Sequence, residues 1–217
     1  MGRNKLKLIA SAIVLAGSGL SLILYYWVTP PFDPRSHEAM GQVAAEETMR
    51  LLGSGGRISV ILRDTVTAKN PATEAQLRSL VASLQVHHLK VTSTNAMKVD
   101  PLRVPSVPPG DFLQILRRGA EGDVIVSFLG PPNLTEQQTV KLDAKGPKVI
   151  ALCSGAISRQ VDLRSLFQRN LVSVAIVNRT VPDSGRPGVT PRAVFDRYYQ
   201  VLTSANLAEW ADAKTTH

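Results

Sequence analysis

The sequence has a single cysteine, Cys153, among its 217 residues. These residues therefore form no internal disulfide, and the folded part must be stabilised by packing. Cys153 lies in the apolar run KVIALCSG, which predicts a buried, unreactive thiol. Histidine is also scarce. His87 and His88 are adjacent, so they point in different directions, and no acidic or thiolate cluster lies beside them. We therefore expect no metal site.

Motifs for common enzyme classes and cofactors are missing as well. The GxGxxG dinucleotide fingerprint does not occur. The glycines at 53–56 follow a predicted helix and precede a strand, the reverse of a phosphate-binding loop. Ser154 lacks the glycine two positions earlier that a nucleophile elbow needs. The third predicted strand ends in Phe128-Leu129-Gly130, without the aspartate of a phosphoacceptor receiver. We expect no cofactor, no catalytic residue and no enzymatic activity.

The charge balance is basic, with a formal net charge of +8, but it is dispersed. No basic run is interleaved with aromatic residues, and aromatics make up only 5% of the chain. Nucleic acid is therefore not an expected partner. The excess could favour an anionic lipid surface or an acidic protein, or it could simply be a solvated mixed surface.

One long hydrophobic run is present, Leu8 to Val28, with 21 residues and no charge. As a helix it would cross a hydrocarbon core of about 30 Å. Arg3, Lys5 and Lys7 precede it, and the next basic residue is Arg35. This asymmetry predicts residues 1–7 in the cytoplasm, 8–28 as a single transmembrane helix in the inner membrane, and the rest in the periplasm. A cleaved signal peptide, cut near residues 16–18, is the alternative.

Two features of this run predict its surroundings. Aromatic rings crowd its outer end, where they favour the membrane interface: Tyr25, Tyr26 and Trp27. Small residues recur four apart and would let another membrane helix approach closely: Ala12 with Ala16, and Gly17 with Ser21. The expected partners are thus the lipid bilayer and other membrane protein subunits. Small residues are equally common in simple anchors, which leaves that alternative open.

Beyond the run, residues 29–56 read as a linker and an amphipathic connecting helix over 33–52, which ends at the glycines of 53–56. Residues 57–217 then alternate between the two periodicities. Short apolar strands are predicted at 57–62, 89–94, 123–129, 148–153 and 171–177. Helices are predicted after Asn70-Pro71, over 111–118, after Thr135, over 162–169, and from Thr190-Pro191 through Ala205.

This alternation predicts a three-layer α/β fold, with a five-stranded, mostly parallel sheet, following one transmembrane helix. The preferred strand order is 2-1-3-4-5, as in flavodoxin-like folds. The segments RISVIL, DVIVSFLG and KVIALCSG, each followed by small and polar residues, give residues 57–206 a pattern that resembles one lobe of a type-I periplasmic binding protein. The resemblance implies mainly a fold.

In an open parallel sheet a ligand binds beyond the carboxyl ends of the strands. The residues that we expect there are Asp64, Thr65, Thr94, Asn133, Ser154, Asn178 and Arg179. Asp64 and Arg179 would be the charged anchors of a polar solute. Polar residues are also what any solvent-facing loop contains, so the pocket is one of two interpretations.

Two functions are compatible with these features. The first is a non-catalytic, membrane-anchored accessory or scaffolding subunit of a larger bacterial membrane complex, whether respiratory, photosynthetic or for transport. Its α/β domain would dock on the periplasmic side. The alternative is a membrane-tethered periplasmic domain that binds or senses a small solute.

Overall fold

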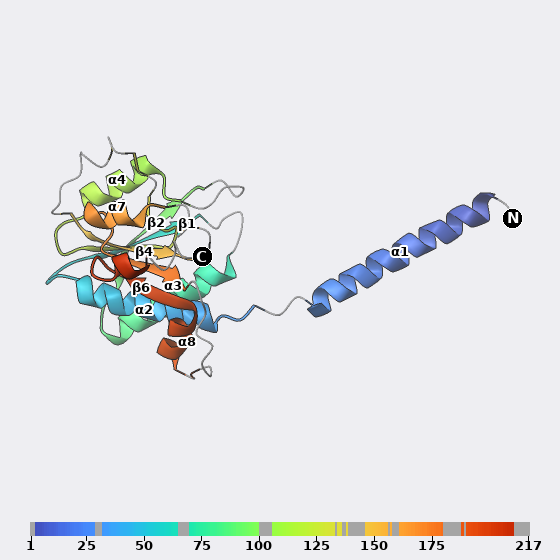
Figure 1. The fold of residues 1–217 in the computed structure, drawn as a ribbon, viewed down its shortest axis with the longest axis horizontal. Helices are drawn as coiled ribbons and strands as arrows, with labels where there is room; N and C mark the ends of the chain where they lie inside the picture. The colour runs from blue at the N-terminus through green and yellow to red at the C-terminus, as the bar shows by residue number, and fades with distance from the viewer. Residues whose placement is uncertain are drawn as a thin grey trace. The chain divides into compact units, whose positions relative to one another are not determined.

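The computed structural model describes residues 3–28, 32–64, 70–99, 106–132, 134–135, 138, 146–155, 157, 161–179, 188 and 190–210. It divides into two units, Met1–Asp33 and Pro34–His217 (Figure 1). Thr65 and Asn133, both predicted ligand residues, lie outside the described part.

The first unit is helix α1, Arg3–Val28, which covers the predicted hydrophobic helix. Its described apolar side chains are exposed, among them Leu15, which is 74% exposed. Among the residues described, no helix is long and apolar enough to cross a membrane. The predicted transmembrane assignment of 8–28 therefore gains no support here.

The roles predicted for residues of α1 in membrane-helix packing and at the membrane interface stay predictions. The side chains of Tyr25, Tyr26 and Trp27 lie outside the described part. Ala12, Ala16, Gly17 and Ser21 are exposed. A Cβ built on Gly17 would meet nothing within 4 Å.

The second unit is built on one sheet of the order β2-β1-β3-β4-β5-β6. The first five strands are parallel, as predicted, and their order confirms 2-1-3-4-5. The strands are β1 Ile58–Arg63, β2 Val91–Met97, β3 Val124–Ser127, β4 Lys148–Cys153, β5 Val174–Asn178 and β6 Tyr199–Leu202. The central strands are buried on both faces, which explains their continuous apolar sequences.

Strand β6 corrects the prediction of one long C-terminal helix through Ala205. Helix α8 is only Pro191–Tyr198, and the chain then turns into β6, which pairs antiparallel with β5. The stretch Tyr-Gln-Val-Leu fits both periodicities. The segment forms a strand rather than continuing the helix, because pairing with β5 satisfies backbone groups along the outer edge of β5 and buries Tyr199 and Leu202.

Helices cover both faces of the sheet in two layers (Figure 1). One face carries α2 Arg35–Leu51, α3 Pro71–Val86 and α8, with Met40, Leu80 and Phe195 fully buried against the strands. The other face carries α4 Pro109–Arg118 and α7 Leu163–Gln168. The predicted N-caps are confirmed: Asn70 accepts from the N–H groups of Ala72 and Thr73, and Thr190 accepts from that of Ala193.

The glycines between α2 and β1 serve a close contact. The N–H of Gly53 donates to the carbonyl of Gly122 at 2.9 Å. A Cβ on Gly56 would lie 2.1 Å from the same carbonyl oxygen. Only glycine allows the two backbones to approach this closely. The turn is thereby fixed to the start of β3, which places Arg57 beside Asp123.

Candidate ligand-binding site

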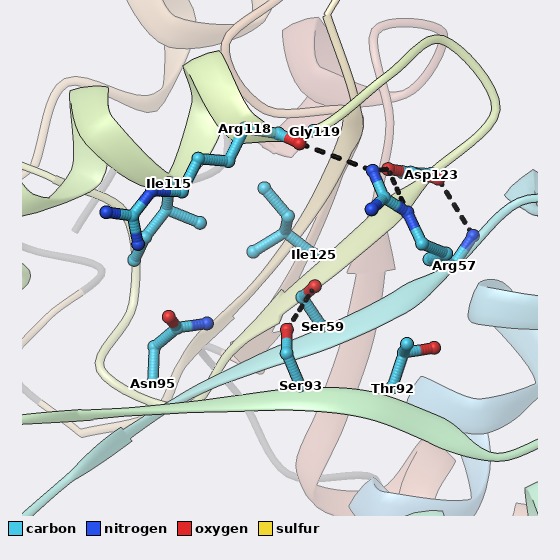
Figure 2. A pocket seen from close by; sticks show the side chains of 10 residues that line it. All are labelled: Arg57, Ser59, Thr92, Ser93, Asn95, Ile115, Arg118, Gly119, Asp123 and Ile125. Carbon is cyan, nitrogen blue, oxygen red and sulfur yellow. Dashed lines mark hydrogen bonds and ion pairs between the residues drawn. The ribbon is translucent and has the colours of Figure 1, made fainter.

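A cavity of about 240 Å³ lies on the α4 face of the sheet, over strands β1 and β2 and beside the C-terminal end of α4 (Figure 2). Strand β2 is an edge strand of mostly exposed polar residues, and α4 covers only part of that face of the sheet, so a cavity remains beside α4. The lining residues are Arg57, Ser59, Thr92, Ser93, Asn95, Ile115, Arg118, Gly119, Asp123 and Ile125. We call this cavity the sheet pocket.

The floor of the sheet pocket is polar because of strand register. Ser59 on β1 lies directly opposite Ser93 on β2. The hydroxyl of Ser93 donates to that of Ser59 at 2.7 Å. Asn95, two residues along β2, lies on the same face, and its Nδ2 donates to the carbonyl of Val60 at 3.3 Å. Its amide oxygen and the two hydroxyls are therefore available at one surface.

One wall is apolar. Ile115 of α4 and Ile125 of β3 line the pocket, and both belong to the cluster buried beneath α4. A polar floor beside an apolar wall can hold a solute that has both hydroxyl groups and a carbon skeleton.

An ion pair closes the end nearest the strand starts. The carboxylate of Asp123 accepts from the Arg57 backbone N–H at 2.8 Å and from its Nη2 at 2.8 Å. It also accepts from the backbone N–H of Ala120 at 2.9 Å. Burial alone raises the pKa of Asp123, but these hydrogen bonds and the guanidinium charge outweigh it, so the pKa lies below its ordinary value.

Arg118 completes the rim from the last turn of α4. Its carbonyl accepts from Arg57 Nη2 at 3.3 Å, which joins the two basic residues through the backbone. Figure 2 shows its side chain extending back past Ile115. Within the described ranges no carboxylate forms an ion pair with its guanidinium.

The predicted carboxyl-edge residues are only partly brought together. Ser154 and Gly155 follow β4, and the Gly155 N–H donates to Asn178 Oδ1 at 2.8 Å. Arg179 instead donates from Nε to the carbonyl of Tyr199 at 3.2 Å, toward β6. Asp64 follows β1, three strand spacings from β5, which is roughly 14 Å. Asp64 and Arg179 therefore lie on separate parts of that edge.

Thr94 requires a correction, because it does not lie at a strand end. Strand β2 continues for three residues beyond it, to Met97. Thr94 pairs with Val60, whose side chain belongs to the core cluster of the α2 face. Its side chain therefore lies on the face opposite the sheet pocket.

The sequence analysis ended the second strand at residue 94, which left Asn95 beyond it, and did not single out Arg57, Ser59, Arg118 or Asp123. A signal was present in the alternation of Ser93 and Asn95, which puts both on one face of a strand. The pairing of Arg57 with Asp123 joins residues 66 apart and has no local signature.

A second hollow, of about 390 Å³, lies between α2, α3 and α8 on the other face of the sheet. It is more open and is lined by helix surface. Ser79 donates to the carbonyl of Glu38 at 2.7 Å, a contact that joins α2 to α3. We favour the sheet pocket because polar groups of separate strands converge there.

Cys153 is buried as predicted, with 0% exposure. Burial raises the pKa of its thiol to about 12. In the part of the chain that is described, no group of three or more His, Cys, Asp and Glu residues could hold a metal ion.

The strand order and layering define a periplasmic-binding-protein-like α/β fold, and solved structures share it. An ABC transporter solute-binding protein from Agrobacterium vitis, bound with alpha-D-tagatopyranose, has a TM-score of 0.52 at 14% identity. That match covers 82% of this chain and 60% of the other. A sugar-binding protein of a sugar ABC transporter from Bacillus halodurans gives 0.51 at 11% identity, covering 80% and 63%.

This chain thus spans less than two thirds of the length of those proteins. Identities this low show likeness of fold alone. No family model matches the sequence, and no curated protein is significantly similar to it.

Proposed function

We propose that this chain binds a small polar solute in the sheet pocket and acts as a binding or sensing domain without catalysis. The observation that carries the proposal is the convergence of Ser59, Ser93 and Asn95 from two strands on one cavity with an apolar wall. A volume of about 240 Å³ suits a small metabolite, since pockets for drug-sized ligands are larger.

The fold supports this function over the accessory subunit. Of the two structural neighbours named above, one is a transporter solute-binding protein with a bound sugar, and the other is the sugar-binding protein of a sugar transporter. We infer that the sheet of residues 58–202 is equivalent to one lobe of such a protein. The sheet pocket is separate from the carboxyl edge, where Ser154, Asn178 and Arg179 could supply further contacts.

For location we propose a membrane tether, with the α/β unit in the periplasm. The support is the uncharged run of 21 residues from Leu8 to Val28 and the basic residues before it. Alkaline carbonate extraction of cell membranes tests the tether: the chain should stay in the pellet. Its release into the supernatant, or a mature chain that lacks the first thirty or so residues, would overturn this part.

Solute binding is tested by thermal shift on the purified full chain with a panel of pentoses, hexoses, sugar acids and small organic acids. We expect at least one compound to raise the melting temperature, since a ligand that binds only the native state stabilises it. Ser93→Val should abolish the shift because it removes a floor hydroxyl.

The matched control is Thr94→Val, on the opposite face of the same strand, which should leave the shift unchanged. Equal shifts in both variants would show that the solute binds elsewhere. No shift with any compound would contradict the proposed function.

A further inference from the structure

The charges around the sheet pocket do not cancel. Among the described residues that line it, two carry a guanidinium group, Arg57 and Arg118, and one carries a carboxylate, Asp123. Asp123 Oδ1 accepts from one N–H, and Oδ2 accepts from Arg57 Nε, Arg57 Nη2 and Ala120 N. This carboxylate is therefore saturated by its own neighbours and is poorly suited to accept from the hydroxyl of a ligand.

The charge of Arg57 is neutralised by that pairing, whereas no carboxylate in the described part of the chain pairs with Arg118. The C-terminal end of a helix disfavours an anion, which works against a negatively charged ligand beside α4. Here the exposed carbonyls are partly satisfied: those of Ile115 and Leu116 accept from Gly119 N, and that of Arg118 accepts from Arg57. A full guanidinium charge outweighs the partial charge that remains.

We propose that the solute of the sheet pocket carries a carboxylate, which pairs with the guanidinium of Arg118. Its hydroxyl groups contact Ser59, Ser93 and Asn95, and its carbon skeleton lies against Ile115. A planar guanidinium matches a carboxylate through two parallel hydrogen bonds, which makes Arg118 the residue that selects the ligand class. This inference rests on the proposed function and narrows it from polar solutes to small organic acids, including sugar acids.

The test compares ligands that differ only in this group. D-Glucuronate has a carboxylate where D-glucose has a hydroxymethyl group. Isothermal titration of the full chain at low ionic strength should show binding of D-glucuronate and weaker or no binding of D-glucose. Arg118→Gln should weaken D-glucuronate binding by about tenfold or more, as expected for the loss of a hydrogen bond to a charged group.

Arg117→Gln is the matched control, because Arg117 is also exposed in the last turn of α4 but does not line the pocket. It should change the affinity by less than about twofold. Citrate, L-malate and inorganic phosphate extend the panel. Binding of citrate or L-malate that depends on Arg118 supports the proposal equally, whereas Arg118-dependent binding of phosphate alone overturns it.

Failure of the carboxylate preference and failure of the solute-binding function would give different results. If D-glucose binds as well as D-glucuronate, and Arg118→Gln has no effect while Ser93→Val abolishes binding, the solute-binding function stands and the carboxylate preference is wrong. If no compound binds, both fail.

Discussion

Arg57 and Asp123 hold the starts of β1 and β3 together through both backbone and side chain. The carboxylate accepts from the Arg57 backbone N–H and from two guanidinium nitrogens, at distances from 2.8 to 3.2 Å. The Arg57 side chain is 55% exposed, whereas that of Asp123 is only 9% exposed. The pair is therefore more than a surface ion pair, because the buried carboxylate also satisfies two backbone N–H groups at the rim of the sheet pocket.

Replacing Asp123 should destabilise the protein. Asp123→Ala leaves the N–H groups of Arg57 and Ala120 without their acceptor, a loss of about 1–3 kcal/mol in the free energy of unfolding. Denaturant titration measures it. Glu121→Ala, two residues away and exposed, should stay within about 0.5 kcal/mol. A similar loss in both variants would mean that the hydrogen bonds of Asp123 contribute nothing specific.

The same carboxylate should give the stability a defined pH dependence. Its pKa is lowered in the folded state, so between that value and the unfolded pKa of about 3.9 the unfolded chain binds more protons. The contribution of Asp123 to the free energy of unfolding is therefore fully present above about pH 5 and is lost as the pH falls through the folded pKa.

Unfolding free energies from pH 6 down to pH 2.5 measure this effect. We call the fall of the unfolding free energy below about pH 5 the acid limb. Asp123→Asn should make the acid limb shallower, whereas Glu121→Gln should leave it unchanged. Parallel curves for the natural protein and Asp123→Asn would show that the pKa of Asp123 does not change on folding.

Local signals predicted the fold well. The apolar run at 148–153 predicted the bounds of β4 correctly. The side chains of the predicted N-caps Asn70 and Thr190 accept hydrogen bonds from the first turns of their helices, as expected. Thr135 likewise donates its N–H to Gln138, the reach-back bond of the predicted capping box. These features depend on residues within a few positions of each other, so the sequence carries them directly.

Tertiary features escaped prediction for the opposite reason. Strand β6 exists because β5 offers an edge to Tyr199 and its neighbours, which the periodicity of the segment cannot reveal. The floor of the sheet pocket depends on the register that places Ser59 opposite Ser93, 34 residues away. The sequence analysis looked instead to the loops at the carboxyl edge of the sheet, and the ligand site expected there stays a prediction.

The single thiol should report on global unfolding. Cys153 has no exposed surface, and burial raises its pKa to about 12, so at pH 8 almost none is thiolate in the folded state. An unfolded cysteine has a pKa of about 8.5 and reacts readily. Labelling with Ellman's reagent should therefore be slow in buffer and rapid in denaturant. Rapid labelling of the native protein would mean that β4 opens locally.

Two glycine substitutions should have opposite effects on stability. Gly56→Ala places a Cβ 2.1 Å from the carbonyl oxygen of Gly122, so the backbone must shift, and we expect a loss of about 2–3 kcal/mol. Gly110→Ala, in the first turn of α4, meets nothing within 4 Å and should stabilise by about 0.4–1 kcal/mol, because it restricts the unfolded chain.

Thermal unfolding of both variants tests the contrast. The displaced turn in Gly56→Ala should also move Arg57 away from Asp123, so this variant should lose part of the acid limb described above, whereas Gly110→Ala should retain it. Equal melting temperatures would contradict the close contact between Gly56 and Gly122. An unchanged acid limb in a destabilised Gly56→Ala would instead show that Arg57 and Asp123 stay paired when the turn is displaced.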